Sequence, residues 1–168
     1  MTRNKNYMIA IPDRFSQVQA CPPGHATVPS PDCAPAPLDY QPVSLIFVRT
    51  PDPVPADSHA MDTARFPDTL TVLTLGAETF PDPLSYLALT DRQLAACLPR
   101  YQVDFCRTET RHRVASQAWF KAHFKVYRLT LSWVYQKALI LITLTTPEIR
   151  RESGWTRVRQ TAESFKLL

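Results

Sequence analysis

A strict alternation of side chains in the second half of the sequence restricts this part of the chain to antiparallel β-structure. Over 118–127, apolar residues at even positions alternate with aromatic or charged residues at odd positions. From 128 to 133, apolar residues at odd positions alternate with polar ones, and Tyr135 continues the odd-numbered set. A period of two places successive side chains on opposite faces of a sheet. The next segment, 138–144, is apolar at nearly every position, which is typical of a central strand that is covered on both faces. We therefore expect consecutive strands here, ended by Pro147.

Shorter strand signals occur earlier in the chain. Segments 7–11, 43–48 and 70–75 are rich in β-branched or apolar residues and are bounded by Pro, Asp or Gly. Segment 101–107 adds another strand. The sequence therefore predicts an antiparallel sheet of six or seven strands.

Two helices are predicted around this sheet. The central one begins with Asp82 as N-cap and Pro83 at the first helical position, has apolar residues at spacings of three and four from Leu84 to Leu98, and ends at Pro99. The C-terminal helix carries its inner stripe at Trp155, Val158, Ala162 and Phe165. This order of elements predicts an α+β fold.

Length and proline content suggest a single domain with one insertion. The chain has 168 residues, of which 45% are hydrophobic and 20% are charged. This is enough to bury one ordinary core, so we expect one domain over 1–168. Twelve of the sixteen prolines precede position 70, and they are dense at about 17–41. Because proline cannot donate a ladder hydrogen bond, we expect this stretch to be a long surface loop.

The predicted elements leave apolar surface to be covered. A sheet of this size is roughly 30 Å wide, whereas two helices packed on one face would cover about 20 Å of it. Segments 45–48 and 139–144 are nevertheless apolar on both sides. We therefore expect a hydrophobic face that is exposed or covered by a partner. The alternative is that the proline-rich loop folds over this face.

Charge and aromatic content bear on whether the chain binds nucleic acid. Residues 1–99 hold 6 Lys/Arg against 10 Asp/Glu, and residues 100–168 hold 13 against 5. The basic residues are interspersed rather than clustered, which favours a solvated face. An aromatic platform for single-stranded nucleic acid beside Lys121 and Lys125 would comprise Trp119, Tyr127, Trp133 and Tyr135. Aromatic residues on strands are more often packing or protein-interface residues, so no nucleic-acid partner is expected.

Nucleotide and metal sites are not expected. Only three glycines occur, at 24, 76 and 154, too few for a glycine-rich phosphate loop. The spacing of Cys21, His25 and Cys33 fits no usual zinc pattern. Asp52, Asp57 and Asp62 are evenly spaced, but they lack the Gly and the terminal Glu of a calcium loop. We expect no cofactor and no metal.

The sequence also gives no indication of a catalytic nucleophile or general base. Cys97 lies on the apolar side of the central helix, where a buried thiol is the simpler interpretation. His123 lies between Lys121 and Lys125, but no carboxylate nearby in sequence could orient it as a base. The sequence therefore predicts a protein that is not an enzyme.

The lengths of the apolar segments indicate which cellular compartment to expect. The longest apolar runs are far shorter than the roughly 20 residues that a membrane-spanning helix requires. The first residues are charged, and their short apolar stretch is broken by Pro12 and Asp13, so a signal peptide is not indicated. We expect a cytoplasmic protein without direct membrane insertion, whose four cysteines remain thiols. A disulfide between Cys21 and Cys33 is the minority alternative.

Several segments resemble the DcrB-like proteins, a branch of the PsbP-like fold. The opening Ile9-Ala-Ile-Pro-Asp-Arg-Phe15 resembles their first strand and turn. Segment 80–101, with Asp91-Arg-Gln-Leu94 and Leu98-Pro-Arg-Tyr101, is similar to their long helix and the turn after it. Segment 134–147 and the helix from Trp155 are similar to their closing hairpin and helix. The resemblance implies a curved antiparallel sheet with both helices packed on one face.

Among these proteins, cytoplasmic members without a lipoprotein signal resemble the Eag-type adaptor chaperones of type VI secretion systems, and this chain resembles them in the same way. The resemblance implies a homodimer that holds the hydrophobic N-terminal transmembrane segments of an effector and aids its loading. The client-binding candidates are Leu45, Ile46, Phe47, Leu131, Trp133 and Leu141. Which sheet face they would present is left open, and so is the role of the proline-rich stretch, which is longer than expected for this family.

Two other functions are kept as alternatives. An immunity-type protein would block a toxin through a charged surface. A ligand-binding or enzymatic derivative of the fold would gather His123 or Cys97 with a carboxylate in a pocket.

Overall fold

The computed structural model describes residues 2–3, 7–18, 43–49, 63, 65–76, 80 and 82–167. Along the chain, the described elements are β1 (Thr2–Arg3), β2 (Tyr7–Ile9), β3 (Phe15–Val18), β4 (Val43–Arg49), β5 (Thr69–Gly76), α2 (Pro83–Cys97), β6 (Gln102–Glu109), β7 (His112–Lys121), β8 (Phe124–Tyr135), β9 (Ala138–Pro147), the 3₁₀ turn η1 (Glu148–Arg150), α3 (Arg151–Glu163) and β10 (Lys166–Leu167). Most of the proline-rich stretch lies outside the described residues, except that Gln17 and Val18 belong to β3.

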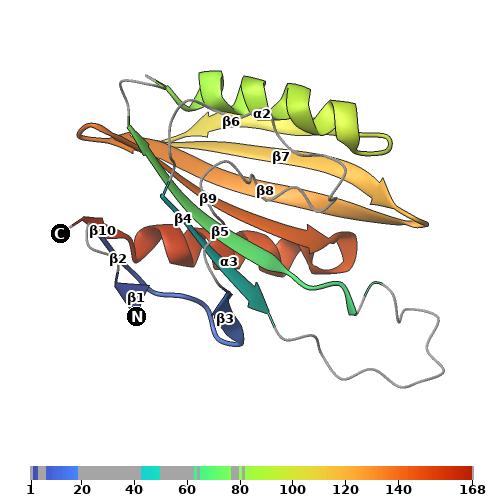
Figure 1. The fold of residues 1–168 in the computed structure, drawn as a ribbon, viewed down its shortest axis with the longest axis horizontal. Coiled ribbons are helices and arrows are strands. Elements are labelled where there is room, and N and C mark those ends of the chain that lie inside the picture. Colours follow the sequence, from blue (N-terminus) through green and yellow to red (C-terminus); the bar gives the residue numbers. More distant parts are fainter. Residues whose placement is uncertain are drawn as a thin grey trace.

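The described strands form one large sheet and one small sheet (Figure 1). The large sheet has seven strands in the order β3-β4-β5-β9-β8-β7-β6, and every neighbouring pair is antiparallel. This confirms the predicted α+β fold with an antiparallel sheet of six or seven strands. The small sheet, β1-β2-β10, takes the strand expected at 7–11 out of the large sheet and pairs it with β10 near the C-terminus.

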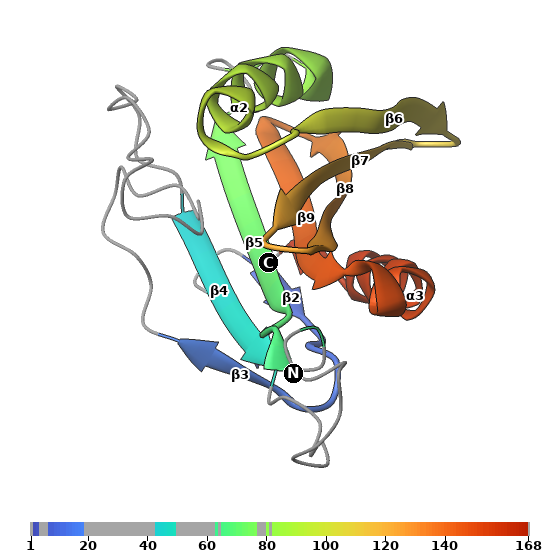
Figure 2. The same cartoon turned by 90° about the vertical axis from the view of Figure 1, so that its right-hand side faces the viewer.

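Helices α2 and α3 lie on opposite faces of the large sheet, rather than on one face as expected (Figure 2). On β9, Ile142 and Leu144 belong to the core that Val158 and Ala162 of α3 complete. The alternate residues Leu139 and Leu141 of β9 pack in a second cluster with Tyr86 of α2. The continuous apolar run of β9 is therefore explained by one helix on each side, and the expectation that one face lacks a cover is wrong for this part of the sheet.

A tight hairpin interrupts the alternation that predicts one strand over 118–127. β7 ends at Lys121, which pairs with Phe124 across a turn of Ala122 and His123. Ala122 has a φ of 55°, in the left-handed region that hairpin turns require. Because the pairing runs through an even number of turn residues, odd-numbered residues of β7 share a face with even-numbered residues of β8, as in the pair Trp119 and Val126.

Local signals at the start of α2 are confirmed. Asp82 accepts a hydrogen bond from the backbone N–H of Ser85 at 3.0 Å and another from the Ser85 hydroxyl at 3.1 Å. These two bonds lower the pKa of the Asp82 carboxyl below its ordinary value. In the part of the chain that the structure describes, neither α2 nor any other helix has the length and hydropathy that crossing a membrane requires.

Candidate binding groove

An open cavity of about 710 Å³ lies at one end of the large sheet, and we call it the aromatic groove. It lies where the start of β7, the end of β8, the end of α3 and β10 meet. Its lining residues are Arg111, His112, Trp133, Val134, Tyr135, Ala162, Phe165 and Lys166.

Strand register brings these residues together from distant parts of the sequence. β7 and β8 are antiparallel, with Arg113 opposite Ser132, so the first residues of β7 lie beside the last residues of β8. After α3 ends, the chain turns back, and Lys166 of β10 pairs with Met8 of β2. The hydroxyl of Ser164 accepts a hydrogen bond from the backbone N–H of Ala10 at 2.9 Å and thereby fixes this return.

Aromatic rings form the inner wall of the groove. Trp133 meets His112 edge to face, with ring centroids 5.2 Å apart, and meets Phe165 in the same manner at 5.4 Å. Behind them, the buried ring of Tyr7 stacks on Phe165 at 5.1 Å. Such pairs stabilise by about 0.5–1.5 kcal/mol beyond the area that they bury. The wall is therefore fixed in position before any ligand arrives.

The rim of the groove exposes apolar surface. Tyr135 is 49% exposed and Val134 is 41% exposed, which is high for large hydrophobic residues. By the alternation of β8, Tyr135 is on the same sheet face as Trp133, whereas Val134 is on the other. Tyr135 thus extends the aromatic wall toward solvent.

Arg111 and Lys166 make the margin of the groove cationic, and the surroundings of His112 favour its neutral form. Burial lowers the pKa of His112 below its ordinary value, and the nearby charges of Arg159 and Arg111 lower it further, whereas Glu109 and Glu163 act in the opposite direction. Both carboxylate oxygens of Glu109 are engaged, one by Arg107 and one by Arg159, each at 2.7 Å.

The six client-binding candidates divide between the two faces of the sheet. Phe47, Leu131 and Leu141 are no more than 2% exposed, Ile46 is 5% exposed, and Leu45 and Trp133 are partly buried. Four of them, namely Leu45, Phe47, Leu131 and Trp133, belong to the core beneath α3. Ile46 pairs with Thr71, and Leu141 packs with α2, on the other face. Of the six, Trp133 alone lines the groove.

Seven of the eight groove residues are not among the binding candidates that the sequence suggests, and these include the three rings beside Trp133. Phe165 was assigned only to the inner stripe of the C-terminal helix, although it lies beyond the end of α3. In the sequence, Tyr135 is a candidate only for the nucleic-acid stacking platform. His112 follows a turn with no distinctive residue pattern, so nothing local marked it.

The alternative chemistries are placed as follows. Cys97 is partly buried and packs against the cluster of Leu94 and Leu98. His123 is exposed in the β7–β8 turn, beside Phe124. In the described ranges, His, Cys, Asp and Glu side chains nowhere gather in threes to bind a metal ion. The motifs at Cys21, His25 and Cys33 and at Asp52, Asp57 and Asp62 lie outside these ranges.

The four aromatics weighed as a stacking platform do not share a surface. Trp119 packs beneath α2, with Leu94 and Val126, on one face of the sheet. Tyr127 and Trp133 belong to the core on the other face. Trp119 and Tyr127 are only 4% and 3% exposed, so neither ring has a face on which a base could stack.

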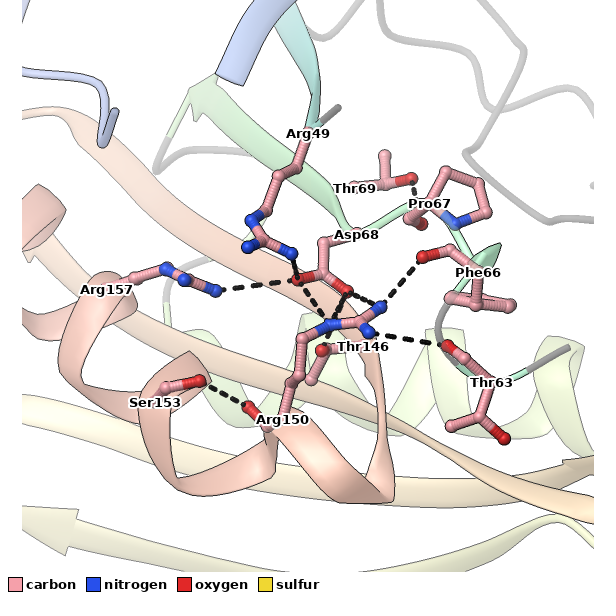
Figure 3. A network of polar contacts seen from close by, with 10 residues as sticks. All are labelled: Arg49, Thr63, Phe66, Pro67, Asp68, Thr69, Thr146, Arg150, Ser153 and Arg157. Carbon is pink, nitrogen blue, oxygen red and sulfur yellow. Dashed lines mark hydrogen bonds and ion pairs between the residues drawn. The ribbon is translucent and has the colours of Figure 1, made fainter. Parts of the chain in front are cut away.

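A buried polar cluster anchors the opposite end of α3 (Figure 3). The Asp68 side chain is fully buried, and it accepts a hydrogen bond from the Thr146 hydroxyl at 2.9 Å. Arg150 donates to the same carboxylate from Nε at 3.1 Å and from Nη2 at 2.8 Å. The guanidinium groups of Arg157 and Arg49 lie 3.5 and 3.9 Å from it.

The cluster also fixes the segment before β5. Arg150 donates from Nη2 to the carbonyl of Phe66 at 2.8 Å and from Nη1 to the carbonyl of Thr63 at 3.3 Å. The cluster thus connects η1 and α3 to β4, to β9 and to the residue before β5, whereas Ala162 near the other end of α3 lines the groove.

Comparisons with known proteins add three structural likenesses. No protein-family model matches the sequence, and no curated protein matches it either. Among solved structures, a Pseudomonas aeruginosa protein of unknown function is 16% identical, with a TM-score of 0.49, over 75% of this chain and 86% of that one. LpqN of Mycobacterium tuberculosis, described as involved in cell envelope biogenesis, is 17% identical with a TM-score of 0.44, over 96% and 82%.

The third likeness is to CyanoP, the PsbP protein of Synechocystis sp. PCC 6803. It is 13% identical with a TM-score of 0.48, over 96% of this chain and 86% of that one. All three TM-scores are below 0.5.

Proposed function

We propose that this chain is a non-catalytic adaptor chaperone that holds a hydrophobic N-terminal segment of another polypeptide, of the kind carried by type VI secretion effectors, in the aromatic groove. The observation that carries the proposal is the preformed wall of Trp133, His112 and Phe165, which opens at an exposed Tyr135. The resemblance to Eag-type proteins supplies the client class. Action on an effector before its secretion implies a cytoplasmic location.

The physical task of such a chaperone is to replace lipid or a protein core with its own side chains. Each buried methylene of a client is stabilised by about 0.8 kcal/mol, so a few inserted side chains supply useful affinity. Rigid aromatic rings give large contact area at small entropic cost. A wall that is already packed against Tyr7 loses little freedom when a client binds.

The size of the groove limits what one copy can hold. A volume of about 710 Å³ accepts a few side chains. A transmembrane helix of about 20 residues is about 30 Å long. One groove therefore binds only part of such a segment. The homodimer that the resemblance implies would present two grooves to the same segment.

Co-expression with effector N-terminal fragments that contain their transmembrane segments tests the proposal. Affinity purification and light scattering of the wild-type protein should recover a soluble complex. Tyr135→Asp should abolish recovery, because it puts a charge on the wall of the groove. Ile149→Asp is the matched control, since Ile149 is 71% exposed on η1, at the opposite end of α3.

Two outcomes would contradict the proposal: recovery that Tyr135→Asp leaves unchanged, or failure of every such fragment to become soluble. Phe47 is unsuitable for this test, because it is 2% exposed and a charge there would report on folding rather than on binding.

A further inference from the structure

The charges around the aromatic groove are unbalanced. Arg111 and Lys166 line it, and both are exposed. Within the described part of the chain, neither side chain forms an ion pair. Two carboxylates lie near enough to act on His112. Glu109 is already shared between Arg107 and Arg159, and in the described part of the chain Glu163 forms no ion pair with Arg111 or Lys166.

An apolar wall in a groove that two such cations also line suits a particular chemistry. Trp133, Phe165 and Tyr135 offer surface for aliphatic or aromatic side chains. Arg111 and Lys166 offer donors to a carboxylate at the margin, where partial enclosure strengthens an ion pair relative to open solvent. A segment with basic flanks would instead be repelled at the same place.

We propose that the groove selects an apolar segment with an Asp or Glu next to it, whose carboxylate binds between Arg111 and Lys166. This inference rests on the proposed function and adds to it the charge of the client beside the bound segment. Arg111 and Lys166 then determine which client segment binds and in which orientation, and the aromatic wall supplies most of the affinity.

Three fluorescent peptides test the charge rule. They share one apolar sequence and differ only at the flanking position, which is Asp, Asn or Lys. Anisotropy titrations with the wild-type protein should rank the affinities Asp above Asn above Lys, with about fivefold between neighbours at low salt. Added salt should reduce the spread, since the pairs lie at the margin of the groove.

Charge reversal should then invert the ranking. Arg111→Glu combined with Lys166→Glu should bind the Lys-flanked peptide more tightly than the Asp-flanked one. Arg92→Glu is the control, because Arg92 is exposed on α2, across the sheet from the groove, and the wild-type order should persist in that variant.

Failure of this inference can be told apart from failure of the proposed function. If all three peptides bind equally and Tyr135→Asp removes the binding, the charge rule is overturned and the groove remains the site. If the double charge reversal leaves the wild-type ranking of peptide affinities unchanged, Arg111 and Lys166 do not recognise the charge beside the apolar segment. The charge rule is then likewise overturned. If no peptide binds the wild-type protein, both the groove function and the rule built on it are overturned.

Discussion

Trp155 of α3 stacks on Phe105 of the edge strand β6, with ring centroids 5.8 Å apart and an interplanar angle of 23°. One turn away on each side, Arg151 pairs with Asp104 and Arg159 pairs with Glu109. Residues four apart lie on one side of a helix, so this stripe of α3 follows the strand. The helix therefore fastens the edge of the sheet as well as covering its core.

Removal of the central stack should loosen β6. Trp155→Ala is expected to lower the free energy of unfolding by about 1–3 kcal/mol, because it deletes an aromatic pair and the area that the pair buries. Hydrogen exchange should increase most in the amides of 102–109. Uniform protection across the sheet, with no selective gain in exchange at β6, would show that the stack does not hold this edge.

Asp68 is predicted to be the most sensitive carboxylate in the described core. Asp68→Asn removes the negative charge that faces Arg49, Arg150 and Arg157, and breaking a buried pair on one side costs about 3–5 kcal/mol. Asp104→Asn is the matched control. Its pair with Arg151 is more than a quarter exposed, so the loss there should be at most about 1 kcal/mol. Urea denaturation of both variants measures the difference, and equal losses would contradict this account of the cluster.

His112 should make stability depend on pH below neutrality. The folded protein holds the pKa of His112 below its ordinary value of 6.5, so the unfolded chain binds its proton more readily. The contribution of this residue is therefore complete above pH 6.5 and is lost as the pH falls toward the lower pKa of the folded state. An NMR titration of the imidazole should give a midpoint below 6.5, and His112→Gln should flatten the decline in the free energy of unfolding over that interval. A midpoint above 6.5 would contradict the assigned environment.

Substitutions in the hairpin turns should be able to raise the free energy of unfolding. Thr110, Ala122 and Gln136 have φ values of 50°, 55° and 54°, in a region that glycine and asparagine enter more readily. Ala122→Gly should therefore raise the free energy of unfolding, by about 0.5–1 kcal/mol. The same change at Ala96, an exposed residue of α2, should lower it by about 1 kcal/mol. Thermal melts of the two variants should shift in opposite directions, and a loss of stability at position 122 would count against the strain.

Local chemistry explains which elements could be predicted from the sequence. The Asp82 cap and Pro83 define the start of α2 within a few residues, and the apolar run of β9 needs no distant information. The β7–β8 turn was missed because Ala122 and His123 carry none of the Asn-Gly or Asp-Gly signals that mark a two-residue hairpin. That omission changed which aromatic residues share a face.

The groove depends on relationships that no short segment contains. His112, Trp133 and Phe165 meet only through strand register and through the return of the chain after α3. The face on which a helix packs is likewise set by three-dimensional connections. An apolar strand such as β9 is equally compatible with one helix on each side and with two helices on one side and a partner on the other.

The most direct test of the central claim is site-specific photocrosslinking in the co-expressed complex. A photoreactive phenylalanine analogue replaces Tyr135 in one preparation and Ile149 in another, and the crosslinked client is mapped by mass spectrometry. The account predicts crosslinks from position 135 to the apolar N-terminal segment of the client and none from position 149. Crosslinks from position 149 alone, or from neither position in a complex that remains intact, would contradict it.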